Sequence, residues 1–394
     1  MITSHVLRST PLFGLLACAS LCTACTGTED PEGTASSSDG GTDVPTTTDA
    51  PTGSTTDAVT TDAADTSGSS GGSTDASTSS GDGTGESSTG EVVCGDPIEL
   101  GVFTPSDGNA RGFEVVGDTV YLAAESGGLA IVDLSDPAAA SEVAIFDLGP
   151  GLLVHRIAVS GTTVYAGLRG SGWAAIDVAD PSTPALLFHE PDVSGQDVAV
   201  ADGVLYVADV NGVQVFDVAD PSAPLALVED LVLPGSTQTV SVAGSYAYAT
   251  GLTAGLSVLD IADPAATVEV TTLDMDGRGY LAVAGDRAYV SASDGVHIVD
   301  VADPSAPVEL GVFATDRPHG LAADDRLWIL GEDTVSVAVP MLQVVDVTDG
   351  AMPVSLFEGF DDWAAPAWIE VSEGRLLFSE EDDDALHVLD TCPQ

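Results

Sequence analysis

The segment GVHIVDVADP, residues 295–304, recurs along the chain with its register preserved. Four close copies are GLAIVDLSDP (128–137), GWAAIDVADP (172–181), GVQVFDVADP (212–221) and GLSVLDIADP (255–264). Two looser copies are MLQVVDVTDG (341–350) and ALHVLDTCP (385–393). Successive copies are about 43 residues apart, which is the length of a four-stranded propeller blade. The repeat therefore predicts seven such blades.

Each repeat reads as four short strands. In the fifth repeat these are LAVAG (281–285), RAYVSA (287–292), VHIVDV (296–301) and VELGVF (308–313). Alternating apolar residues and a high β-branched content favour strands, and no helical period of 3.6 residues is present. The predicted fold is all-β: a seven-bladed β-propeller of four-stranded blades.

Recurring positions within the repeat mark its turns. In the five close copies, a glycine precedes the third strand and an Asp-x-x-Asp-Pro phrase stands at the end of that strand. The first aspartate of that phrase is expected to accept backbone N–H groups in an Asx-turn, while the proline fixes φ for the bend. Because these aspartates recur at one structural position, we interpret them as architectural rather than catalytic. They are Asp133, Asp177, Asp217, Asp260, Asp300, Asp346 and Asp390.

The repeated phrase resembles the LVIVD repeat, a family of bacterial surface and secreted β-propellers. The resemblance covers residues 98–394, although the sixth and seventh copies lack the glycine and the Asp-Pro pair. It implies a propeller fold and a location outside the cytoplasm, and it implies no particular reaction.

The two ends of the repeat region complement each other. Residues 98–103 (IELGVF) nearly repeat 308–313 (VELGVF), so they form a fourth strand without a third, whereas the chain ends on a third strand without a fourth. We therefore expect the N-terminal strand to join the last blade and close the ring. Cys94 and Cys392 then fall in the same turn and are positioned for a disulfide, which would stabilise the ring by several kcal/mol. The alternative is a pair of free surface thiols.

The charge is strongly one-sided. The chain has 62 acidic residues against nine basic ones, and its formal net charge is −53. This argues against binding to nucleic acid or to an anionic membrane surface, because both need a positive patch. The charge is explained by solubility or, alternatively, by a calcium-binding surface.

The first 92 residues have a different composition. Residues 1–25 read as a signal peptide whose Leu21–Cys25 end resembles a lipobox, so Cys25 is the expected lipid-attachment site. A rival match ends at Cys18, and an ordinary cleaved signal peptide is the other alternative. Residues 26–92 are almost purely Thr, Ser, Asp, Gly and Ala, which predicts a disordered acidic stalk. The propeller then occupies 93–394, and we expect a monomeric lipoprotein of the cell envelope. Its only membrane attachment is the lipid anchor, and it faces the periplasm or the cell surface from the outer membrane.

Aligning the repeats places one residue of each blade at the mouth of the central channel. These are Arg111, His155, Gln196, Gln238, Gly279, His319 and Ala367. Their neighbours Arg156, Asp197, Arg278, Tyr280, Arg317 and Trp368 are expected nearby. Such a cationic mouth in an acidic protein is suited to a carboxylated or sulfated glycan, or to an acidic peptide. The alternative is that these side chains only satisfy carbonyls and water in the channel.

Sequence signs of catalysis are sparse. The sequence has no Gly-x-Ser-x-Gly elbow, His-Glu-x-x-His motif or phosphate loop, and Asp197 is the one candidate general base at the mouth. The acidic runs 361–362 and 380–384 offer oxygen ligands for calcium, although solvated turns explain them equally. We expect a binding or scaffold module without a required cofactor; the alternative is a hydrolase or lyase acting on an acidic polysaccharide.

Overall fold

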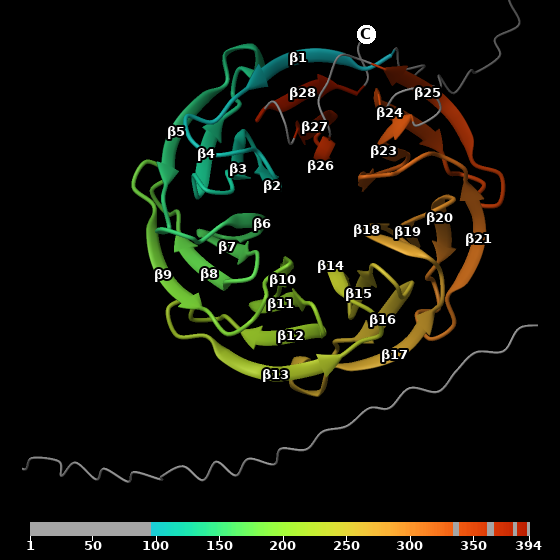
Figure 1. Cartoon of the computed structure of the whole chain (residues 1–394), viewed down its shortest axis with the longest axis horizontal. Helices are drawn as coiled ribbons and strands as arrows, with labels where there is room; N and C mark the ends of the chain where they lie inside the picture. The colour runs from blue at the N-terminus through green and yellow to red at the C-terminus, as the bar shows by residue number, and fades with distance from the viewer. Residues whose placement is uncertain (1–95, 334–338, 361–365, 381–383, 392–394) are drawn as a thin grey trace, which may run out of the picture. The chain divides into compact units, whose positions relative to one another are not determined.

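The computed structural model describes residues 96–333, 339–360, 366–380 and 384–391. These residues form seven antiparallel four-stranded sheets arranged as blades around a central channel (Figure 1). The seven-bladed β-propeller predicted from the repeats is therefore confirmed. The described residues include no helix that is long and apolar enough to span a membrane.

Blades 1 to 3 use consecutive strands, which follow one another from the channel outward. Blade 1 has β2 (Phe113–Val116), β3 (Thr119–Ala123), β4 (Leu129–Asp133) and β5 (Ser141–Phe146). Blade 2 has β6 (Val154–Ser160), β7 (Thr163–Leu168), β8 (Gly172–Asp177) and β9 (Ala185–Glu190). Blade 3 has β10 (Asp197–Ala201), β11 (Val204–Asp209), β12 (Gly212–Asp217) and β13 (Leu225–Val232).

Blades 4 to 6 follow the same order. Blade 4 has β14 (Thr237–Ala243), β15 (Tyr246–Gly251), β16 (Leu256–Asp260) and β17 (Val268–Leu273). Blade 5 has β18 (Gly277–Ala284), β19 (Arg287–Ala292), β20 (Gly295–Asp300) and β21 (Val308–Phe313). Blade 6 has β22 (Gly320–Ala323), β23 (Leu327–Asp333), β24 (Val339–Asp346) and β25 (Val354–Phe360).

Blade 7 combines both ends of the described chain. Its inner strands are β26 (Pro366–Ser372), β27 (Arg375–Glu380) and β28 (Leu386–Asp390), and its outer strand is β1 (Ile98–Phe103). Ile98 pairs with Asp390 and Phe103 pairs with Leu386, so the N-terminal strand closes the ring as predicted (Figure 1).

Every blade contains a bulge between its third and fourth strands. In blade 5, Ile298 pairs with Gly311 and Val299 pairs with Glu309, which leaves Leu310 as the extra residue. In blade 7 the register shifts in the same way between Glu99 and Gly101. Such a bulge bends the outer strand and increases its twist. Because β1 has the same bulge as the outer strands of the other blades, it takes the place of a fourth strand in blade 7.

The turns after the third strands pack against the preceding blade. Beside β1 lies the short 3₁₀ helix η1 (Pro137–Ala139) of blade 1; its counterpart η2 (Pro264–Ala266) of blade 4 lies beside β13. A Cβ at Gly101 would lie 2.0 Å from the Pro137 carbonyl oxygen, so only glycine fits there. Neighbouring blades therefore contact each other through backbone as well as side chains.

Six of the seven repeat aspartates form Asx-turns, each followed by a second Asx-turn, in agreement with an architectural role. Oδ1 of Asp177 accepts the N–H of Ala179, and Oδ1 of Asp180 accepts the N–H of Ser182. The first of these two bonds was expected from the repeated phrase, and the second was not. The same first bond is made by Asp133, Asp217, Asp260, Asp300 and Asp346.

The hydrophobic core is divided among the interfaces between blades. Seven clusters of buried residues each combine side chains of two adjacent blades. The cluster that joins blades 7 and 1 includes Phe103, Phe113, Leu377 and Val388. Because burying each such side chain contributes roughly 1.5–3 kcal/mol, ring closure is a hydrophobic event as well as a hydrogen-bonding one.

Candidate functional site

The inner strands all begin at one end of the channel, which we call the mouth. His155, Gln238 and Ala367 are the second residues of β6, β14 and β26, while Gly279 is the third residue of β18. The other three predicted ring members lie just before their inner strands. Arg111 is two residues before β2, and Gln196 and His319 directly precede β10 and β22. The structure thus places each of the seven at the start of its blade.

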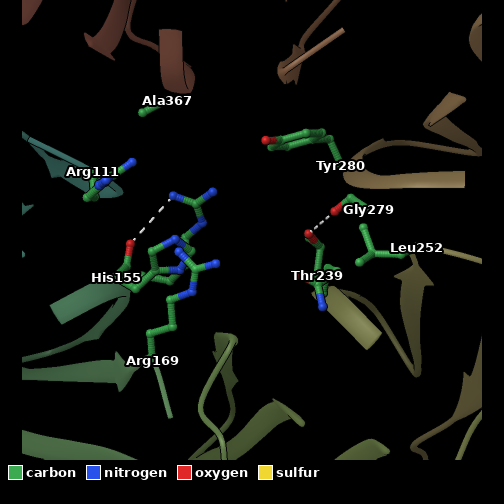
Figure 2. Close-up of a pocket in the computed structure, with 10 residues that line it drawn as sticks. Arg111, His155, Arg169, Thr239, Leu252, Gly279, Tyr280 and Ala367 are labelled. Carbon is green, nitrogen blue, oxygen red and sulfur yellow. Dashed lines mark hydrogen bonds between the residues drawn. The ribbon is translucent and has the colours of Figure 1, made fainter. Parts of the chain in front are cut away.

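A cavity of about 190 Å³ lies at the mouth. Figure 2 shows its lining side chains, with arginines on one side and Tyr280 and Thr239 on the other. We call it the mouth cavity. It is lined by Arg111, His155, Arg156, Arg169, Gln238, Thr239, Leu252, Gly279, Tyr280 and Ala367.

Three guanidinium groups, of Arg111, Arg156 and Arg169, form the arginine wall of this cavity. Arg111 Nη2 lies 3.5 Å from Glu125 Oε1. The Arg156 guanidinium lies 4.1 Å from the centre of the Trp368 ring, a cation–π contact that joins blades 2 and 7 across the channel. Arg169 is exposed, and its side chain forms no ion pair with another described residue.

His155 is neutral within this cationic group. Its Nδ1 lies 3.2 Å from the carbonyl oxygen of Gln196, which only accepts hydrogen bonds, so Nδ1 holds the proton. Burial and, to a lesser extent, the charge of Arg156 lower the pKa of His155 to about 3, so the imidazole does not become a fourth cation. The remaining ring nitrogen, Nε2, is an acceptor.

Asp197, the candidate general base, lies outside the lining of the mouth cavity. Its carboxylate is buried and accepts the backbone N–H of Val240 at 3.0 Å, which joins blades 3 and 4. Burial raises the pKa of Asp197 to about 6, although the nearby Arg156 opposes the shift. Asp197 does not line the mouth cavity, and its hydrogen bond indicates that it holds two inner strands together.

The wall opposite the arginines is neutral. The Thr239 hydroxyl donates to the carbonyl of Gly279, which joins blades 4 and 5, and Leu252 adds an apolar surface (Figure 2). The Tyr280 hydroxyl points into the cavity (Figure 2). The Tyr280 ring packs edge-on against His319, with 6.2 Å between the ring centres.

Several predicted residues lie beside the mouth cavity rather than in its wall. Gln196 supplies the carbonyl that orients His155, and Trp368 supplies the ring beneath Arg156. His319 lies 3.8 Å from Glu332, and Arg317 pairs with the same carboxylate at 3.1 Å. Arg278 belongs to β18, but its side chain lies outside the described residues.

Three lining residues were not predicted from the sequence: Arg169, Thr239 and Leu252. Arg169 follows β7 directly and Leu252 follows β15 directly, so both occupy the turn between the second and third strands. In an antiparallel blade this turn lies at the same end as the start of the first strand. Aligning the residue after each second strand would have found both.

The structure also brings together two carboxyl groups that no sequence pattern connected. Glu114 of β2 accepts the N–H of Val159 at 2.6 Å, and Glu370 of β26 accepts the N–H of Val115 at 3.3 Å. Burial raises the pKa of Glu114 to about 7. Burial and the charge of Glu114 raise the pKa of Glu370 to about 8. Neither residue lines the mouth cavity.

Other predicted sites lie mostly outside the described residues. These include Cys25, Cys94, Cys392, the stalk 26–92, and the acidic residues 361–362 and 381–383. Glu380 is described, and its Oε1 lies 3.2 Å from His387 Nε2. Among the described residues, no three His, Cys, Asp or Glu side chains are grouped so that they would hold a metal ion.

Comparison with known proteins identifies the repeat. The model of the LVIVD repeat matches residues 107–147, 153–189, 194–229, 234–274 and 279–315, which fall in the first five blades. No characterised protein sequence matches the chain.

Solved structures match the fold at low sequence identity. Sqt1 from Saccharomyces cerevisiae matches with a TM-score of 0.57 and 6% identity, over 75% of this chain and 99% of its own. BamB from Moraxella catarrhalis matches with a TM-score of 0.53 and 13% identity, over 76% of this chain and 99% of its own. The computationally designed Ika8 matches with a TM-score of 0.56 and 12% identity, over 74% and 98%. At these identities the likeness concerns the fold alone.

Proposed function

Because this chain belongs to the LVIVD-repeat family and folds as a seven-bladed β-propeller, we propose that it is a binding module whose anionic ligand occupies the mouth cavity. The observation that supports this function is the arginine wall: Arg111, Arg156 and Arg169 line one cavity of a chain with a net charge of −53. A cationic pocket within an acidic surface attracts anions and repels cations. Guanidinium groups also bind carboxylate and sulfate in bidentate geometry.

The decisive experiment combines ligand screening with one substitution. The full chain is applied to an array of acidic and neutral glycans and acidic peptides, and each ligand that binds is tested again with Arg169→Gln. Because Arg169 is exposed and its side chain is not part of the core, this variant retains the fold. Loss of one charge-assisted hydrogen bond predicts an affinity about tenfold lower.

Arg375→Gln is the matched control for this experiment. Arg375 begins β27 at the end of the blade away from the mouth, where its Nη1 lies 3.4 Å from Asp118. The Arg375→Gln substitution removes the same charge without altering the cavity, so the affinity for the acidic ligand should not change. Binding confined to neutral ligands, or binding that Arg169→Gln and Arg375→Gln weaken equally, would refute the proposed site.

A second candidate function is hydrolysis or elimination on an acidic polysaccharide. One observation favours it: the raised pKa values of Glu114 and Glu370 keep at least one proton in the channel near neutral pH, as a general acid requires. Neither carboxyl lines the mouth cavity, so binding is the first choice. Release of reducing ends or unsaturated products from a bound polysaccharide, abolished by Glu114→Gln, would establish the enzyme instead.

We further propose that the propeller is held at the cell envelope by acylation of Cys25, with residues 26–92 as its stalk and the outer membrane as its destination. The lipobox-like Leu21–Cys25 and the acidic Thr/Ser/Asp/Gly composition that follows support this assignment. Cells grown with a palmitate analogue should label the wild-type chain and leave Cys25→Ala unlabelled. Equal labelling of both chains would exclude this anchor.

A further inference from the structure

The mouth cavity combines features that a simple anion does not need. One wall is cationic, whereas the opposite wall has the Tyr280 hydroxyl, the Thr239 side chain and the apolar Leu252 (Figure 2). Acetate or sulfate would contact only the arginine wall. A ligand that fills the cavity needs one charged edge, a hydroxylated rim and an apolar face.

The neutral His155 adds a specific requirement. Its Nδ1–H is directed to the carbonyl of Gln196, so Nε2 is an acceptor beside the three guanidinium groups of the arginine wall. An acceptor beside three cations is of no use to a fully ionised group, which has no proton to donate. It is suited to a hydroxyl on the same ligand that presents the anion.

The size of the cavity restricts the ligand further. The volume of the mouth cavity is about 190 Å³. Pockets for drug-sized ligands are larger, about 300–1,000 Å³. The mouth cavity therefore accommodates one small ring rather than several joined rings inside it.

We propose that the mouth cavity binds one sugar-acid residue, either free uronate or the end of a polyuronate chain. Its carboxylate lies on the arginine wall, a hydroxyl donates to His155 Nε2, and the ring packs against Tyr280 and Leu252. This inference rests on the proposed function and specifies the ligand class of the same site.

Calorimetric titration of the full chain with four probes tests the ligand class. The probes are glucuronate, glucose, acetate and sulfate. Glucuronate should bind at least about tenfold more tightly than each of the others, because only it engages both walls. Tyr280→Phe, which keeps the ring and removes the hydroxyl, should weaken glucuronate about threefold to tenfold and leave acetate unchanged.

The acceptor role of His155 gives a second test, in the pH dependence of binding. Since the imidazole stays neutral, His155 should add no pH dependence to glucuronate affinity between about pH 5.5 and 8. Asp197, Glu114 and Glu370 do titrate in this range, so the pH profile is measured for the wild type and for His155→Gln, and the two profiles should be parallel. A rise in wild-type affinity below about pH 6.5, the ordinary pKa of histidine, that is absent in His155→Gln would indicate an imidazolium donor and overturn the arrangement.

The outcomes separate this inference from the proposed function. Acetate or sulfate could bind as tightly as glucuronate, with Arg169→Gln weakening the binding of both kinds of ligand. That result would support the anion site and overturn the proposal that its ligand is a sugar acid. If glucose binds as tightly as glucuronate, the arginine wall has no role and both proposals are overturned. If none of the anions binds and no other acidic ligand does, both are likewise overturned.

Discussion

Glu114 and Glu370 each bind the backbone of the next blade, and burial favours their protonated forms. The pKa of Glu370 rises from 4.5 to about 8, so the native state binds more protons than the unfolded chain between these pH values. Stability contributed by such a group falls as the pH rises through this interval. Mildly acidic conditions therefore favour the contacts between blades 7, 1 and 2.

Glu370→Gln tests this linkage at the residue scale. Glutamine keeps an oxygen for the Val115 N–H and has no charge, so the variant should be more stable than the wild type at about pH 8.5. The expected gain is of the order of 2–4 kcal/mol, and it should largely disappear at about pH 5. Denaturant unfolding at the two pH values gives the measurement.

Glu373→Gln is the control for this substitution, because Glu373 is exposed in the turn of the same blade. It should alter stability little at either pH. An equal gain from both substitutions would mean that general charge reduction, rather than the buried carboxyl pair, explains the result.

Residue positions were more predictable from sequence than residue states. The repeat register placed His155 at the start of an inner strand because one offset applies to every blade. The neutral form of His155, the burial of Asp197 and the meeting of Glu114 with Glu370 depend on neighbours in adjacent blades. Those neighbours lie about 40 residues or more away in sequence, so no local pattern specifies them.

At the scale of elements, His387 joins three strands of the closing blade. Its Nδ1 lies 2.8 Å from Glu99 of β1, and its Nε2 lies 3.2 Å from Glu380 of β27. Burial lowers the pKa of His387, but the hydrogen bonds to Glu380 and Glu99 outweigh burial and raise it above 6.5. The stabilisation is therefore complete below about pH 6.5 and is lost as the pH rises through the raised value.

His387→Gln should loosen β1 in a pH-dependent manner. At about pH 6 the variant should unfold with a free energy about 1 kcal/mol lower than the wild type, a figure reduced because Glu99 is partly exposed. At about pH 9 the difference should shrink, since the wild type has then lost its imidazolium. Limited proteolysis near residue 98 at both pH values reports the same loosening directly.

His189→Gln is the matched control for the element. His189 lies in the fourth strand of blade 2, and its Nε2 contacts the Ser171 carbonyl at 2.8 Å rather than a carboxylate. It should leave the protease sensitivity of β1 unchanged. If β1 of the wild type resists protease equally at both pH values, the proposed stabilisation of β1 by the ion pairs of His387 is wrong.

The elements themselves were largely predictable. The alternation in RAYVSA and VHIVDV specifies strands, and the four expected in the fifth repeat appear as β18 to β21. The first of them begins at Gly277 rather than at residue 281. Polar and small residues at the mouth obscured that start, because alternation signals a strand only where one of its faces is buried.

At the scale of the whole molecule, the ring is closed by non-covalent contacts of β1, and we propose that a Cys94–Cys392 disulfide closes it again. The pairing of Ile98 with Asp390 supports the bond, because these two residues lie four and two positions from the cysteines in the sequence. In the chain-entropy model, a disulfide that closes a loop of about 300 residues stabilises the fold by roughly 6 kcal/mol.

Reduction, or the double substitution Cys94→Ser and Cys392→Ser, should lower the melting temperature without preventing folding, since the interface clusters remain. The bond opposes peeling of β1, so its loss should accelerate unfolding more than it slows folding. Mass spectrometry of a non-reduced digest identifies the linkage. Two alkylatable thiols in protein isolated from the envelope would exclude it.

The strand exchange in blade 7 also has a consequence for the order of synthesis. Of the described strands, β1 is synthesised first, but its partner β28 follows it by about 290 residues. β1 therefore has no strand partner during the synthesis of the first six blades. Contacts between such distant segments form slowly. A chain that lacks residues 386–390 has no β28, so β1 and β27 would each have an unpaired strand edge. Synthesis through Asp390 is thus the condition for a closed ring, and an exposed strand edge distinguishes chains that lack β28 from chains that have it.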